Sequence, residues 1–90
     1  MSKQQEPNIL EKIKKDMDGF VGQEISLKAN TGRKKVFEVN GILEQTYPNI
    51  FVVKFQERQV ERRVSYTYAD LLTEVVEVSI GDTRIGVQTN

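Results

Sequence analysis

Ile50-Phe51-Val52-Val53-Lys54-Phe55 is the most apolar run in this sequence, and it is the clearest indication of the fold class. Five of its six side chains are apolar, so both faces of an extended strand here would be largely hydrophobic. Such a strand is typical of the interior of a sheet, or of a position where a helix covers its outer face. Turn residues precede the run at 47–49, and a polar loop follows at 56–59. We therefore expect a β-rich protein built around this strand.

The segments on either side of this run alternate with the period of two that strands show. Ile25, Leu27 and Ala29 share one face of such a strand, and polar residues occupy the other. Gly41 lies within the next segment, where a glycine often marks a bulge or a bend. The alternation predicts five strands, near residues 24–29, 35–46, 50–56, 60–68 and 74–80. It also predicts five buried side chains within them: Leu27, Phe51, Val53, Val64 and Val78.

Before the first strand, the apolar residues change to helical spacing. Ile9, Ile13 and Met17 recur on one face, and charged residues occupy the opposite face. Pro7 suits the first turn of a helix and Gly19 suits its left-handed end, so a helix is predicted over residues 7–18. Its narrow apolar stripe should lie against the core. If the helix does not dock there, the same three residues become a partner or dimer face.

These elements predict a mainly β fold, a small five-stranded SH3-like (Sm-like) barrel with one N-terminal α-helix. Five short antiparallel strands with a bend in the second can curl into such a barrel. Residues 69–72 are too short for a full helix and are predicted as a single turn before the last strand. We expect one domain over residues 7–80, preceded by a flexible leader at 1–6. Residues 81–90 are expected to form a loose tail or a weak extra strand.

The composition excludes several classes of protein. The 90 residues contain no cysteine and no histidine, which excludes disulfides and thiolate metal sites and removes the commonest general base. We therefore expect no enzyme, no bound metal and no cofactor. Thirteen basic residues balance thirteen acidic ones, so no overall field attracts nucleic acid or a membrane. Without a membrane-spanning run or a signal-peptide pattern, the chain is expected in the cytoplasm.

Three blocks of the sequence, taken together, resemble the Veg family. They are Leu27-Lys28-Ala29-Asn30-x-Gly32-Arg33-Lys34-Lys35, Gly41-Ile42-Leu43-x-x-Thr46-Tyr47-Pro48-x-x-Phe51-Val52, and Arg63-Val64-Ser65-Tyr66-x-Tyr68-Ala69-Asp70-x-Leu72-Thr73-Glu74. The resemblance runs from about Gly19 to Val78. It implies a small cytoplasmic protein of low-GC Gram-positive bacteria with an SH3-like barrel and no known enzymatic activity. It also implies a stimulator of biofilm formation that is linked to transcription through effects on a regulator.

The most distinctive charge feature is a basic hairpin at residues 28–35. Four cations in eight residues flank a turn, and the N–H groups of such turns can bind anions. The alternative is a solvated hairpin whose lysines protect a sheet edge from aggregation. Arg63 would extend the cluster if it lies across the sheet from Lys34 or Lys35. The candidate phosphate-binding or partner-binding residues are thus Lys28, Asn30, Arg33, Lys34, Lys35 and Arg63.

Two functional hypotheses follow from these observations. In the first, the barrel surface or the N-terminal helix binds a regulator protein; in the second, the basic hairpin binds nucleic acid directly. The balanced net charge favours the first, and the local basic cluster favours the second. An exposed apolar surface would indicate a protein partner, whereas a merged basic face free of carboxylates would indicate nucleic acid. A homo-oligomer is compatible with either hypothesis.

Overall fold

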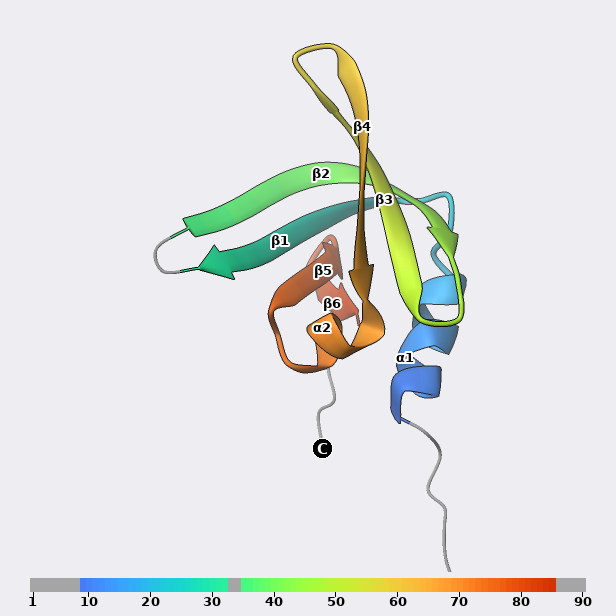
Figure 1. Cartoon of the computed structure of the whole chain (residues 1–90). Coiled ribbons are helices and arrows are strands. Elements are labelled where there is room, and N and C mark those ends of the chain that lie inside the picture. The colour runs from blue at the N-terminus through green and yellow to red at the C-terminus, as the bar shows by residue number, and fades with distance from the viewer. Residues whose placement is uncertain (1–8, 33–34, 86–90) are drawn as a thin grey trace, which may run out of the picture.

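The strands of the protein form one antiparallel sheet, on which two helices lie (Figure 1). The computed structural model describes residues 9–32 and 35–85. Along the chain, its elements are α1 (Ile9–Asp18), β1 (Glu24–Gly32), β2 (Lys35–Thr46), β3 (Ile50–Glu57), β4 (Val60–Thr67), α2 (Tyr68–Leu72), β5 (Val76–Ile80) and β6 (Thr83–Ile85). The strand order across the sheet is β4-β3-β2-β1-β5-β6, so the apolar strand β3 is an interior strand, as expected.

The predicted fold class is confirmed: the protein is a mainly β, small barrel-like fold with one N-terminal helix. The described residues contain six strands instead of the expected five. The additional strand, β6, forms because Ile85 pairs with Val78 of β5 and is buried. The expected leader at 1–6, the first two residues of the expected helix, at 7–8, and the end of the expected tail, at 86–90, lie outside the described residues.

The predicted single turn at residues 69–72 is a five-residue α-helix, α2, which begins one residue earlier at Tyr68. A capping box sets this start. The Thr67 hydroxyl accepts a hydrogen bond from the Asp70 N–H at 3.0 Å, and the Asp70 carboxylate accepts one from the Thr67 N–H at 3.1 Å. Strand β4 therefore ends at Thr67, one residue before the expected end.

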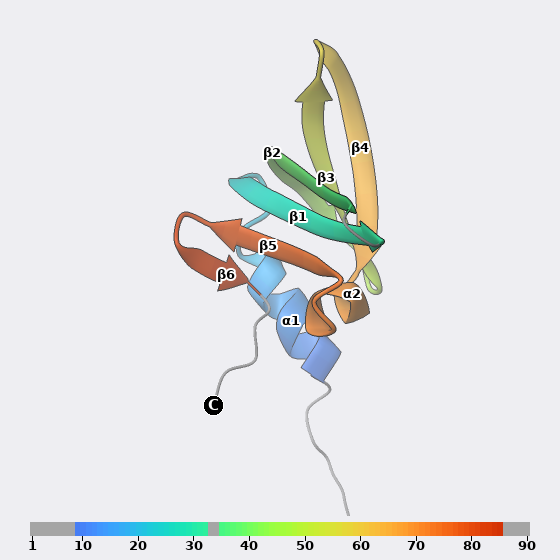
Figure 2. The same ribbon diagram turned by 90° about the vertical axis from the view of Figure 1, so that its left-hand side faces the viewer.

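The sheet curves where β2 passes Gly41. A Cβ atom at Gly41 would lie 2.5 Å from the carbonyl oxygen of Lys54 on β3, so only glycine permits this close approach of the two backbones. A bulge follows between Leu43 and Gln45, and it also bends the strand. As a result, the β3–β4 hairpin rises away from the layer formed by β1, β5 and β6 (Figure 2).

The core lies between the inner face of the sheet and the two helices. Of the five side chains expected to be buried, Leu27, Phe51, Val53 and Val78 are buried in this core. Val64 is only half-buried, because β4 is an edge strand with a neighbour on one side alone. The Tyr68 hydroxyl lies within hydrogen-bond distance of two backbone carbonyls, those of Tyr47 at 2.6 Å and Ile50 at 2.9 Å, and ties α2 to the β2–β3 turn.

Candidate functional site

The candidate site is the outer face of the sheet, the face opposite the buried core, over β1, β2 and β5. The strand register arranges its side chains in three rows, because directly paired residues of an antiparallel sheet share a face. The polar row is Asn40, Ser26 and Ser79; the charged row is Glu38, Lys28 and Glu77; the valine row is Val36, Asn30 and Val75. Lys28 and Asn30, two of the predicted site residues, occupy the middle of the second and third rows.

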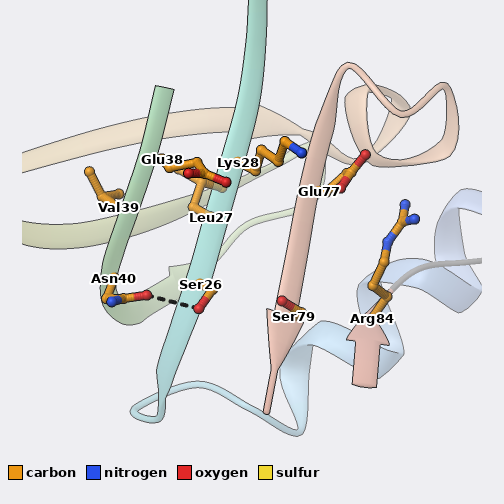
Figure 3. A pocket seen from close by; sticks show the side chains of 9 residues that line it. All are labelled: Ser26, Leu27, Lys28, Glu38, Val39, Asn40, Glu77, Ser79 and Arg84. Carbon is orange, nitrogen blue, oxygen red and sulfur yellow. Dashed lines mark hydrogen bonds between the residues drawn. The ribbon is translucent and has the colours of Figure 1, made fainter. Parts of the chain in front are cut away.

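The charged row surrounds one cation with two carboxylates. Lys28 on β1 pairs in register with Glu38 on β2 and with Glu77 on β5. Figure 3 shows the three side chains together on the surface of these strands. Opposite charges that face each other across strands attract, and here two carboxylates outweigh one ammonium group. The row therefore carries a net negative charge, which opposes the binding of phosphate by Lys28.

The polar row lines a shallow hollow on the same face. The Ser26 hydroxyl donates a 2.8 Å hydrogen bond to the side-chain oxygen of Asn40, drawn as the dashed line in Figure 3. With the charged row and Arg84, these residues line a volume of about 450 Å³. Within residues 9–32 and 35–85, no cluster of three carboxylates exists that could hold a metal ion. The hollow offers hydrogen-bond donors and acceptors together with side chains of both charges, and this mixture suits contact with a protein surface.

The valine row adds apolar surface beside the charges. Val36 pairs in register with Asn30, whose N–H donates a 2.8 Å hydrogen bond to the carbonyl oxygen of Val75. Val36 is 52% exposed and Val75 is 43% exposed. The two valines lie on either side of Asn30 and give this face two small apolar areas, each smaller than the contiguous patches that mark an interaction surface on their own. Neither valine is among the residues predicted from the sequence, although the period of two in β2 already places Val36 on the same face as Glu38.

The remaining residues of the basic hairpin are described only in part. Arg33 and Lys34 lie outside the described residues, and Lys35 is described only through its backbone at the start of β2. The structure therefore places Lys28 and Asn30 of this cluster on the outer face and leaves the geometry of the three consecutive cations undescribed.

Arg63 does not join the basic hairpin. It lies on β4 opposite Lys54, which in turn pairs with Ile42 of β2. Ile42 and Lys35 are seven residues apart along β2, a separation of about 23 Å in an extended strand. The merged basic face that would indicate nucleic-acid binding therefore does not include Arg63.

Two carboxylates also neutralise Arg63. Its Nε lies 2.7 Å from an oxygen of Glu44, and its Nη2 lies 3.0 Å from an oxygen of Glu61. The hydrogen bonds from Arg63 hold the pKa of Glu44 below its ordinary value. This group of charges satisfies itself on the surface and offers no free cation to a phosphate.

The predicted helix face is not available to a partner. Ile13 and Met17 are fully buried in the core, because α1 docks on the sheet as the narrow stripe suggested. Of the three predicted face residues, only Ile9 is exposed. A partner that binds through apolar contacts must therefore use another surface, and the valine row is such a surface.

Comparison with known proteins identifies one protein family. The model of the family described as biofilm formation stimulator VEG matches residues 8–79. This span includes both helices, strands β1–β4 and all three rows of the outer face. No curated protein matches the chain. In the part of the chain that the structure describes, no helix is long and apolar enough to cross a membrane.

Proposed function

Because the chain belongs to the VEG family of biofilm formation stimulators, we propose that it acts as a non-enzymatic regulatory protein in the cytoplasm. Its partner is a protein that regulates transcription, and binding changes the activity of that regulator. The contact surface is the outer face of β1, β2 and β5.

The arrangement of the charged row beside the valine row supports this proposal. Binding to a nucleic-acid backbone depends on cations that replace condensed counterions at the phosphates. Lys28 is a poor candidate for this role, because Glu38 and Glu77 flank it and would repel a phosphate. Removal of Val36 and Val75 from water by a protein partner, in contrast, lowers the free energy of the complex.

Charge also indicates the kind of protein surface that would fit. The charged row reads acid, base, acid across three adjacent strands. A complementary partner presents basic side chains to Glu38 and Glu77, with apolar side chains placed to cover the two valines. Such complementarity contributes specificity and association rate more than raw affinity.

Direct binding to nucleic acid is the second candidate function. The observation that favours it is the run of three consecutive cations, Arg33-Lys34-Lys35. Under this alternative the hairpin tip makes the phosphate contacts without help from Lys28 or Arg63, because carboxylates neighbour both. A site of two or three contacts would bind weakly, with a modest salt slope of about −2 to −3 on duplex DNA.

In-cell photo-cross-linking tests the proposal. A photoreactive amino acid replaces Val36 in one variant and Val21 in a control, since Val21 is also exposed but lies in the turn between α1 and β1. We expect a protein adduct at position 36 that survives nuclease treatment, and none at position 21. Adducts that disappear with nuclease, or that form equally at both positions, would contradict a protein-binding outer face.

A further inference from the structure

Strand β4 exposes one of the two edges of the sheet. Its partner on the other side is β3, with Glu57 paired to Val60 across the two-residue turn Arg58-Gln59. Both turn residues have positive φ, 53° and 70°, as a type I′ hairpin requires. In such a hairpin, the residues that flank the turn bond to each other, and hydrogen-bonded pairs then alternate along the ladder.

This alternation determines which backbone groups of β4 are free. Val60, Arg62 and Val64 direct their N–H and C=O groups toward β3, so those of Glu61 and Arg63 face the open edge. The part of β4 next to the turn also projects clear of both helices (Figures 1 and 2). The other end of the strand is occupied, because α2 begins directly after Thr67. The accessible edge is therefore residues 60–64.

We propose that this edge pairs antiparallel with the same edge of a second copy of the chain, centred on Arg62. In that register, Glu61 of each copy faces Arg63 of the other, and Val60 faces Val64. The backbone groups of Glu61 and Arg63 supply the hydrogen bonds between the copies. The pairing extends the sheet across the dimer and covers Val60, which is 52% exposed in the single chain.

Charge complementarity selects this register over its neighbours. Moving the centre to Arg63 places the two Arg63 side chains opposite each other, and moving it to Glu61 does the same for the two Glu61 side chains. Like charges that face each other across strands are destabilising. The proposed register also places the two Arg62 side chains opposite each other, each paired with Glu57 of its own chain at 2.8 Å. It differs from its neighbours because it alone adds two Glu61–Arg63 pairs between the copies.

The inference is independent of the proposed function, because it uses β4 and not the outer-face rows. It concerns the assembly of the protein, and a regulator contact on β1, β2 and β5 neither requires it nor excludes it. The two can therefore fail separately.

A single introduced cysteine tests both the dimer and its register, because the chain has no cysteine of its own. At the centre of the pairing, the two copies of residue 62 form a non-hydrogen-bonded pair with Cα atoms about 4.5 Å apart, within reach of a disulfide. We expect Arg62→Cys to form a covalent dimer on mild oxidation. Ser65→Cys is the matched control, since in this register its copies lie about 20 Å apart and should stay monomeric.

Charge variants provide a second measurement by analytical ultracentrifugation. Glu61→Arg should abolish the dimer, because it faces Arg63 of the other copy, and the double exchange with Arg63→Glu should restore it. Circular dichroism checks that each variant is folded. A parent chain that stays monomeric at every concentration, or a cross-link stronger at Ser65→Cys than at Arg62→Cys, would overturn the proposal.

Discussion

Replacing Gly41 by alanine is the sharpest test of how the sheet acquires its curvature. The new Cβ would lie 2.5 Å from the carbonyl oxygen of Lys54 and about 3 Å from side-chain atoms of Phe55 and Val53. Ordinary contacts begin near 3.4 Å, so β3 must move away from β2 by nearly 1 Å at its closest point. Overpacking of this kind costs about 1–3 kcal/mol. For a chain of this size, each 1 kcal/mol lowers Tm by about 4–8 °C. Urea unfolding followed by circular dichroism measures the loss.

Gly19→Ala is the matched control for this substitution. The nearest atom to a Cβ at Gly19 is the carbonyl oxygen of Asp16 at 3.6 Å, an ordinary contact. Gly19 also has no positive φ, so the left-handed end of the helix expected at this residue does not form there. The control should therefore unfold at the same urea concentration as the parent or at a slightly higher one, since alanine reduces the entropy of the unfolded chain. If Gly41→Ala were as stable as Gly19→Ala, the close crossing of β2 and β3 would not exist as described.

Three further predictions concern single groups and the basic tip. Tyr68→Phe should lower the free energy of unfolding by about 1–2 kcal/mol in urea titrations, because it removes the hydroxyl that contacts two carbonyls. Burial raises the pKa of Tyr68, so the parent should lose stability as the pH rises above about 10, and the variant should lose less. A hydrogen bond from the Thr46 hydroxyl of β2, and then one from Lys14 of α1, lower the pKa of Asp18. The stabilisation of the fold by ionised Asp18 is complete above about pH 4, the pKa in the unfolded chain, and is lost as the pH falls through the lower pKa of the folded chain. Asp18→Asn should therefore reduce the loss of stability in acid. Alanine at all three positions of the basic tip should leave duplex-DNA binding near background, as in the parent; a salt slope that flattens by about two to three units would support nucleic-acid binding instead. The three tip positions are Arg33, Lys34 and Lys35.

Much of the fold could be predicted from local patterns in the sequence. The apolar run at 50–55 identified an interior strand because both of its faces are largely apolar, and Phe51 and Val53 are fully buried. Gly41 marked the bend because a glycine within a strand is otherwise unfavourable. The sequence pattern does not specify the short strand β6, since a single buried side chain, Ile85, is too weak a pattern to distinguish a strand from a loose tail.

The candidate site could be predicted only in part, because its chemistry depends on pairs far apart in the sequence. The basic character of Lys28 is evident locally, but Glu77 joins it only through the pairing of β1 with β5. Arg63 meets Glu44 because a bulge in β2 brings the two side chains together across the sheet. Strand register, which no local pattern specifies, therefore decides whether a run of cations forms a basic face or a balanced one.

Biofilm formation in the natural host, with its own copy of the protein deleted, distinguishes a protein-binding outer face from a nucleic-acid-binding hairpin. One complementing variant carries Val36→Asp and Val75→Asp, a second carries alanine at Arg33, Lys34 and Lys35, and a third carries the control substitution Val21→Asp. Circular dichroism checks that all three are folded, and the two valine variants should be, because the substituted valines are exposed. A protein-binding outer face predicts that the first variant fails to stimulate biofilm formation while the other two restore it. Loss of stimulation in the alanine variant, with full activity in the Val36→Asp and Val75→Asp variant, would contradict protein binding by the outer face.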